Sequence, residues 1–293
     1  MTKSDIVLYV ITVLIWGSSW IATHYQAAMI APEVSIVWRY GLATPLMFAV
    51  AAYRGEGLRY GLAAHGTFVA LGLCIFSVNY MLFYHAAQHV SSGLLSIEFT
   101  LAAVGNVLLS AVVFGTRIER RAIIGGIIGI AGVAAMFYPQ IKGLSLDGGA
   151  LLGFVLGLVA TSCFCFGNMV SLAAKRRKLP VFATLSWAML YGTVIVALVG
   201  VAKGEAFVID WSPIYLGSLV YLVLLASVVG FGTYFTLLNR IGAARAGYST
   251  VLYPVVALAV STWLEDYRWT PLAIAGLAAV LFGVILVLRQ PKA

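Results

Sequence analysis

Residues 213–237 read PIYLGSLVYLVLLASVVGFGTYFTL, a run of 25 residues without one charged side chain. About 20 apolar residues in a helix cross the roughly 30 Å hydrocarbon core of a bilayer, so this run predicts a transmembrane helix. Working outward, nine further apolar runs follow one another with short polar connections. We place the ten spans at about 5–24, 34–53, 66–87, 91–114, 121–138, 149–173, 180–202, 213–237, 245–264 and 270–288.

The composition of the whole chain leads to the same conclusion. Of its 293 residues, 62% are hydrophobic and 10% are charged, against about 45–50% apolar and about 25% charged residues in soluble domains. So few polar residues could not cover the surface of a soluble protein. The net charge of +8 is spread in short clusters between the apolar runs, which membrane topology explains better than a nucleic-acid-binding face. We therefore expect an all-α polytopic protein that contacts the lipid bilayer and no nucleic acid.

The basic residues also predict how the chain is oriented. If the ten spans alternate, 14 Lys and Arg residues lie on the side of the N-terminus and 3 lie on the opposite side, with Arg39 inside a span. Cytoplasmic loops carry the excess of Lys and Arg. We therefore expect both termini in the cytoplasm and, for a bacterial protein, a location in the inner membrane.

An offset of 154 residues places the stretch Tyr80–Ala103 on the stretch Tyr234–Ala257. The offset pairs Tyr80 with Tyr234, Gly93 with Gly247, Ser96 with Thr250 and Phe99 with Tyr253. Because each half holds five spans, an odd number, the second half would enter the membrane in the opposite sense. The sequence thus predicts two inverted five-helix repeats, residues 1–145 and 146–293. Such repeats are typical of secondary transporters, which bind substrate near the membrane midplane between the halves.

Glu98 is the one acidic residue deep inside a predicted span. A carboxylate at a helix centre costs roughly 2.5–3.5 kcal/mol to insert, so such residues are functional candidates. We interpret Glu98 as a contact for a substrate amine or a proton-coupling group, and the alternative is a structural partner for Arg39. For Arg39 we favour a structural role over binding of a substrate carboxylate, because it lies near a helix end and can pair there.

Aromatic and small polar residues gather on three predicted helices. Several of the rings lie too deep for the interfacial belts in which aromatic residues usually occur. A cavity lined by rings with a few polar groups suits an amphipathic or aromatic solute, and ring faces attract an ammonium group. Ordinary packing is the alternative. The candidate cavity residues are Trp16, Trp20, Asn79, Tyr80, Phe83, Tyr84, Glu98, Tyr248 and Tyr253.

A second group of residues indicates structure or gating. Pro254 lacks an N–H and so predicts a kink in the ninth span, either static or used in gating. Gly93 and Gly247 occupy the same position of the two predicted repeats. Glycines spaced by three or four residues in the fifth and sixth spans fit close helix packing, and we leave a homodimer open. His85 and His89 lack a third ligand nearby, so we expect no metal and no cofactor.

Several motifs together resemble the drug/metabolite transporter superfamily, in its branch of ten-helix EamA-type exporters. They are Trp16-Gly17-Ser18-Ser19-Trp20, Arg39 after Pro32, Pro254 followed by Glu265, and then Gly276 and Gly283. The resemblance covers nearly the whole chain and is greatest to exporters of aromatic and neutral amino acids. It implies a central cavity lined by the first, third, fourth, sixth, eighth and ninth helices, with the fifth and tenth as peripheral scaffold. The first half departs from the pattern, with Thr100 where the second half has Pro254.

The sequence therefore predicts a secondary transporter that exports small amphipathic metabolites, chiefly aromatic or neutral amino acids, by alternating access. No nucleotide-binding loop is present to make it an ATP-driven pump. An exporter of cationic drugs or toxins in the same fold is the alternative. A membrane enzyme would need a catalytic set that the sequence does not offer, and a sensor would need a soluble output domain. The direction of net flux stays open.

Overall fold

The computed structural model describes residues 2–115, 118, 120–143, 149–247, 249–265 and 269–288, and the regular structure in these segments is helical. In chain order the helices are α1 (Lys3–Met29), α2 (Pro32–Tyr53), α3 (Leu62–Leu71), η1 (Gly72–Val78), α4 (Asn79–Ala87), α5 (Ser92–Phe99), α6 (Ala102–Phe114), α7 (Arg120–Gly143), α8 (Gly149–Arg176), α9 (Val181–Ala202), α10 (Pro213–Tyr221), η2 (Leu222–Gly230), α11 (Phe231–Gly247), α12 (Ser249–Leu264) and α13 (Pro271–Leu288). The segments η1 and η2 are π-helical and continue their neighbouring α-helices without a break.

The expected all-α polytopic membrane architecture is confirmed. Within the described segments, seven helical spans are long and apolar enough to cross a membrane, and three shorter apolar helices accompany them. The seven spans are Lys3–Met29, Pro32–Tyr53, Leu62–Ala87, Ser92–Phe114, Gly149–Arg176, Val181–Ala202 and Pro213–Ile241. The count of ten membrane crossings and the inverted repeat stay predictions.

Local signals in the sequence set several helix starts. Thr2 caps α1 through a capping box, in which its hydroxyl accepts from the backbone N–H of Asp5 and the Asp5 carboxylate accepts from the backbone N–H of Thr2. Proline begins α2 and α10, where its missing N–H has no helical partner in any case. At the end of the eighth predicted span, which we placed at 213–237, α11 continues to Gly247.

The fourth predicted span is interrupted between α5 and α6. The backbone N–H groups of Thr100 and Leu101 donate to carbonyls three residues back, those of Ile97 and Glu98. The Thr100 hydroxyl also donates to the Ile97 carbonyl at 2.6 Å. Three-residue hydrogen bonds tighten the chain locally, and such stretches within helices often mark functional hinges. The interruption therefore lies directly beside Glu98 and Phe99.

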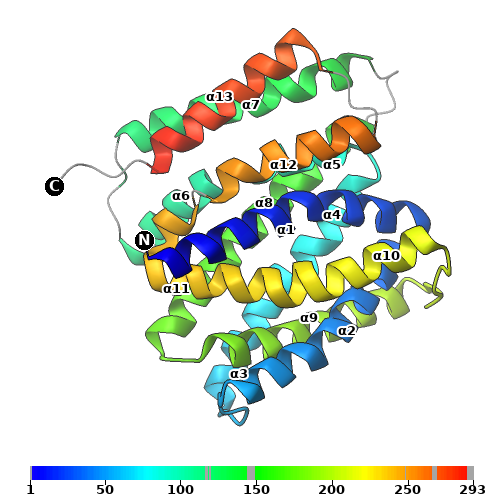
Figure 1. Cartoon of the computed structure of the whole chain (residues 1–293), viewed down its shortest axis with the longest axis vertical. Helices are drawn as coiled ribbons and strands as arrows, with labels where there is room; N and C mark the ends of the chain where they lie inside the picture. The colour runs from blue at the N-terminus through cyan, green and yellow to red at the C-terminus, as the bar shows by residue number, and fades with distance from the viewer. Residues whose placement is uncertain are drawn as a thin grey trace.

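Figure 1 shows α7 and α13 side by side at one edge of the bundle, with α1 beginning and α13 ending on the same side of the view. Two glycine pairs let α7 and α13 approach closely. A Cβ built on Gly132 would lie 2.7 Å from the Gly276 carbonyl oxygen, and one on Gly283 would overlap the Gly125 carbonyl. Small residues that bring helix backbones together are the usual device of membrane packing.

Inside the bundle, helices from the two halves of the chain alternate. Helix α2 packs along α9, α1 packs against α12, α10 and η2, and α4 packs against α8. Helix α5 lies between α12 and α8. These contacts enclose the aromatic core, while large apolar side chains such as Val112, Ile127 and Phe282 point outward. Outward apolar side chains are what a surface solvated by lipid requires.

Candidate functional site

A small cavity of about 40 Å³ lies between helices of the first and second halves of the chain. Side chains from α1, α2, α4, α5, α8, α11 and α12 line it: Trp16, Ser19, Trp20, Thr23, Arg39, Asn79, Tyr80, Phe83, Phe99, Phe164, Phe231 and Tyr253. The lining is thus mostly aromatic, with one cation and a few neutral polar groups.

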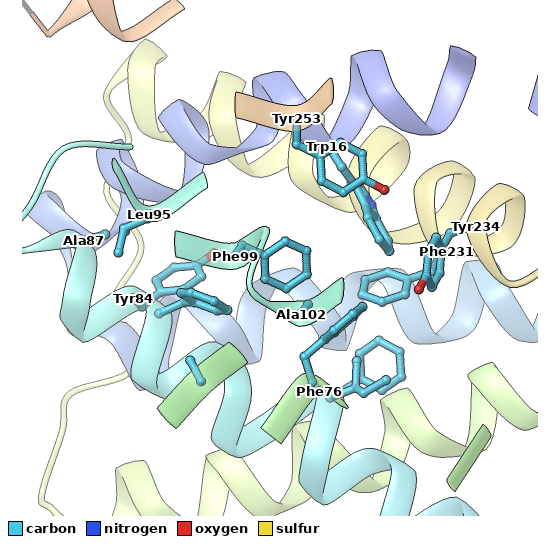
Figure 2. Packing of buried hydrophobic residues seen from close by; sticks show 14 of the residues in the cluster. Trp16, Phe76, Tyr84, Ala87, Leu95, Phe99, Ala102, Phe231, Tyr234 and Tyr253 are labelled. Atoms are coloured by element: carbon cyan, nitrogen blue, oxygen red, sulfur yellow. The ribbon is translucent and has the colours of Figure 1, made fainter. Parts of the chain in front are cut away.

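The aromatic side chains form a continuous wall. Trp20 of α1 meets Phe83 at 5.0 Å and Phe99 at 5.6 Å between ring centroids. Phe99 in turn meets Phe164 of α8 at 4.7 Å and stacks on Tyr253 at 6.4 Å. Figure 2 shows the rings of Phe99 and Tyr253 with those of other core residues converging from different helices. Edge-to-face and offset contacts of this kind fix the orientation of each ring.

Trp16 is held by the π-helical segment η2. Its indole N–H donates to the carbonyl of Ala226 at 3.1 Å, and its ring lies 5.0 Å from that of Phe231. Gly230 leaves the space that the indole occupies, because a Cβ there would overlap the indole nitrogen. Segments of π-helix are frequent at functional sites. Here the segment supplies both a carbonyl acceptor and a gap for a cavity side chain.

Arg39 is the one cation among the residues that line the cavity, and it is only 1% exposed. Its Nε donates to the hydroxyl of Ser227 in η2 at 3.0 Å, and its Nη2 donates to the Tyr80 hydroxyl at 3.4 Å. The guanidinium carbon lies 4.5 Å from the ring centroid of Tyr80 and 5.0 Å from that of Tyr40. Cation–π contacts of this kind partly replace lost hydration.

The structure brings six of the nine predicted cavity residues to this cavity: Trp16, Trp20, Asn79, Tyr80, Phe83 and Tyr253. Tyr84 lies elsewhere on α4, where its hydroxyl donates to Gln26 of α1 at 2.8 Å. Tyr248 lies outside the described residues. Glu98 is not part of the lining.

Glu98 is fully buried in α5 where α8 passes. Gly157 of α8 leaves room for it, since a Cβ on that glycine would overlap the carboxyl group. Neither carboxyl oxygen has a hydrogen-bond partner within the described part of the chain. The interaction with Arg39 that we considered from the sequence is absent, because these two described side chains form no ion pair and Arg39 contacts Ser227 and Tyr80 instead.

The residues expected to serve structure or gating lie outside the aromatic wall, apart from Arg39. Gly93 brings α5 close to α12, since a Cβ there would lie 2.8 Å from Leu258. Gly247 is the last residue of α11, and Pro254 lies inside α12. The helix continues through Pro254, one residue beyond the Tyr253 ring that lines the cavity.

Five lining residues were not among our candidates: Ser19, Thr23, Phe99, Phe164 and Phe231. Two of them follow Trp16 at intervals of three and seven residues, which places them on the same helix face. Phe99 could have been found as the partner of Tyr253 in the 154-residue offset. No pattern in the sequence singles out Phe164 or Phe231 from the other apolar residues of their helices.

Comparison with known proteins adds independent information. The sequence profile of the EamA-like transporter family matches residues 3–138 and again residues 151–289. A crystal structure superposes with a TM-score of 0.72 at 16% identity, covering 98% of this chain and 96% of that chain. At this identity the likeness shows the fold alone.

Three curated relatives illustrate the family. A probable amino-acid metabolite efflux pump of Escherichia coli is 26% identical, over 97% of this chain and 94% of its own. An uncharacterized transporter of Archaeoglobus fulgidus is also 26% identical, over 97% of this chain and 98% of its own. A probable terminal-alkyne amino-acid exporter of Streptantibioticus cattleyicolor is 29% identical, over 69% of this chain and 66% of its own. With its apolar helices and its two profile matches, the chain belongs to the EamA-like transporter family and is a multi-pass membrane transporter.

Proposed function

We propose that this transporter exports aromatic and other neutral amino acids, or metabolites that resemble them, across a bacterial inner membrane. The observation that carries the proposal is the aromatic wall of the cavity, with Arg39 as the one cation among the residues that line it. Such a site accepts a solute with an apolar side chain at one end and a charged group at the other. The names of the relatives from Escherichia coli and Streptantibioticus cattleyicolor are consistent with substrates of this class.

The proposed mechanism is alternating access between two five-helix halves, residues 1–145 and 146–293. The contacts between helices support it. Helix α2 pairs with α9 and α7 pairs with α13, so the second and fifth spans of one half each meet their counterparts in the other. Helix α1, the first span of the first half, packs on η2 and α11 of the second half. Helix α8, the first span of the second half, packs in the same way on η1 and α4 of the first half. The cavity lies between these halves, as in transporters built from inverted repeats.

Export of cationic drugs is the second candidate, and the aromatic wall favours it, since ring faces attract ammonium groups. The position of Arg39 opposes it. A permanent cation that entered the cavity would meet a guanidinium that has no acidic partner among the described residues, and like charges repel strongly where water is scarce. We therefore place the cationic substrates second.

Flux of radiolabelled phenylalanine and threonine into proteoliposomes tests the proposal, with empty liposomes as the control. We expect saturable flux of phenylalanine above the empty control. Other neutral amino acids should compete with this flux, and a quaternary amine such as benzyltrimethylammonium should not. If folded protein transported the quaternary amine and transported neither phenylalanine nor threonine, export of cationic drugs would replace export of amino acids as the proposed function.

The proposed orientation, with both termini in the cytoplasm, has its own test. Gly57 lies in the exposed connection between α2 and α3, and Ala206 lies in the exposed connection between α9 and α10. Single cysteines at these positions, in a chain without Cys74, Cys163 and Cys165, would be labelled from opposite sides. We expect a membrane-impermeant maleimide to label Ala206→Cys in intact cells and Gly57→Cys only after lysis. The reverse pattern would invert the topology and the direction of export.

A further inference from the structure

The buried guanidinium of Arg39 has unused hydrogen-bonding capacity. Its Nε is occupied by Ser227, and its Nη2 reaches the Tyr80 hydroxyl only at 3.4 Å, near the limit for a hydrogen bond. Its Nη1 is buried and has no partner in the described part of the chain. A guanidinium presents five N–H donors in a fixed planar fork. The Nη1 group therefore keeps donors without a partner in a residue that lines the cavity.

The charge of Arg39 is also uncompensated. Among the described residues, no carboxylate lies within ion-pair distance of it, and its close neighbours are the rings of Tyr40 and Tyr80. Buried arginines are almost always paired, and an unpaired buried charge is costly. Glu98, the nearest candidate from the sequence, is packed against Gly157 of α8 instead. Among the described residues the guanidinium thus has no acidic partner, and a bound anion would supply one.

We propose that Arg39 is the specificity-determining residue of the cavity and that it binds the carboxylate of the transported molecule. The inference rests on the proposed function and refines it. The Nη1 and Nη2 groups match the two oxygens of a carboxylate, the geometry for which arginine is preferred over lysine. A side chain attached to that carboxylate would extend toward Trp20, Phe83 and Phe99, which form the wall of the same cavity.

Two further features prepare Arg39 for this role. The bond from Nε to Ser227 anchors the guanidinium to η2, so its plane is fixed before a ligand arrives. The rings of Tyr80 and Tyr40 lie 4.5 Å and 5.0 Å from the guanidinium carbon and restrict its position further. A group held in place in this way loses little conformational freedom when the ligand binds.

Asn79, which lines the same cavity, can accept a hydrogen bond from the amine of an amino acid. The side-chain N–H₂ of Asn79 donates to the backbone carbonyl of Ala160 at 2.8 Å, which leaves its Oδ1 as an acceptor. The aromatic wall supplies ring faces for the same ammonium. These contacts are weaker than a pairing of carboxylate and guanidinium. Removing the carboxylate from a ligand should therefore lower its affinity more than removing the amine.

Three ligands that share the phenyl group separate the contributions of carboxylate and amine in the unmodified protein. Phenylalanine carries both groups, 3-phenylpropionate lacks the amine, and phenethylamine lacks the carboxylate. We expect 3-phenylpropionate to compete with radiolabelled phenylalanine for binding in detergent and phenethylamine to compete at least tenfold more weakly, because a hydrogen bond to a charged group is worth more than a tenfold change in affinity. Equal competition by phenethylamine would overturn the inference and leave the amino acid transporter in place.

Variants of the protein provide the second arm. We expect Arg39→Gln to weaken binding of phenylalanine and 3-phenylpropionate roughly ten- to hundredfold while the weak binding of phenethylamine stays the same or improves. Arg39→Lys should restore part of the affinity, since it keeps the charge without the fork. Arg54→Gln is the matched control, because Arg54 lies at the exposed end of α2, over the ring of Phe182 and outside the cavity.

The two proposals fail in different ways. If neither phenylalanine nor 3-phenylpropionate binds to folded protein, the amino acid function and the role of Arg39 both fall. If both bind and Arg39→Gln binds them as the unmodified protein does, only the role of Arg39 falls. Should Arg39→Gln not fold, Ser227→Ala serves in its place: it frees the guanidinium from its anchor, and we expect a severalfold loss of affinity for carboxylates alone.

Discussion

The rings of Phe99 in α5 and Tyr253 in α12 stack with their centroids 6.4 Å apart and an angle of 22° between their planes. The 154-residue offset in the sequence assigns these two residues to the same position of the two predicted repeats. They therefore meet where one half of the chain faces the other, and both line the cavity. Relative movement of the halves would change this contact directly.

We predict that Tyr253→Ala lowers the affinity for phenylalanine about three- to tenfold, because it removes a ring contact worth about 0.5–1.5 kcal/mol. Tyr253→Phe should keep nearly full affinity, since the hydroxyl points to Ser249 one turn earlier at 2.8 Å and the ring is unchanged. The concentration dependence of flux in proteoliposomes measures both variants. If Tyr253→Phe were as impaired as Tyr253→Ala, the hydroxyl rather than the ring would be the contributing group.

Gly230→Ala should displace Trp16 from the cavity, because the added Cβ would overlap the indole nitrogen that donates to Ala226. We expect weaker substrate binding and a blue- or red-shifted tryptophan emission, together with a lower unfolding temperature. The matched control is Gly217→Ala in α10, where a Cβ meets no atom within 4 Å. Normal binding by Gly230→Ala, with the control unaffected, would show that the indole position is not needed.

Gly132→Ala should destabilise the protein without changing its substrate preference. The new Cβ would lie 2.7 Å from the Gly276 carbonyl oxygen and 2.8 Å from the Val280 backbone nitrogen, and backbone atoms cannot move aside easily. Overpacking typically costs about 1–3 kcal/mol. No described residue of α7 or α13 lines the cavity, so the affinity of the remaining folded protein should be normal. Thermal unfolding in detergent, with Gly66→Ala as a control in open space, provides the measurement.

Glu98→Gln should bind phenylalanine with normal affinity and transport it more slowly. Glu98 does not line the cavity, so the substrate does not contact it directly. Its burial without a partner is typical of intramembrane carboxyl groups that carry a proton during a transport cycle. Binding in detergent and flux under an imposed pH gradient separate the two effects. Unchanged flux would make Glu98 structural, and lost binding would restore the contact with a substrate amine.

Much of the fold follows from the sequence because a bilayer imposes simple rules. Apolar runs long enough to cross it must be helical, and their ends lie where charges and prolines begin. Several predicted runs accordingly agree with the helices within a few residues, as at 149–173 against Gly149–Arg176 and at 180–202 against Val181–Ala202. The eighth run, predicted to end at 237, instead continues to Gly247.

Local irregularities were harder to predict, and Thr100 and Pro254 show why. Proline lacks an N–H, so the sequence predicts a kink at Pro254, and α12 continues through this residue without ending there. The helix ends instead at the equivalent position in the other half, where the Thr100 hydroxyl bonds to the carbonyl of Ile97. A threonine can make the same bond in an unbroken helix. Its effect therefore depends on packing with neighbouring helices, which the local sequence does not contain.

The candidate site was only partly predictable for a similar reason. Rings and amides on one helix face could be recognised as a group, as on α1 and α4. Phe164 and Phe231 reach the cavity because of how α8 and α11 are rotated about their axes. The rotation of α11 follows from η2, and a π-helical segment has no signature in residue type. From the sequence we favoured a structural role for Arg39, and the structure shows it in the lining of the cavity, bonded to Ser227 of that segment.

Because of the segment η2, the number of residues at this point of the chain determines how α11 is rotated about its axis. A π-helical turn holds more residues than an α-helical one, and each residue of an α-helix turns the chain by about 100°. Deleting a single residue within Leu222–Gly230 would rotate α11 by about that angle relative to α10, and Phe231 would turn away from the cavity toward another neighbour. Two family members that share every motif but differ by one residue here would thus offer their substrates different faces of the same helix.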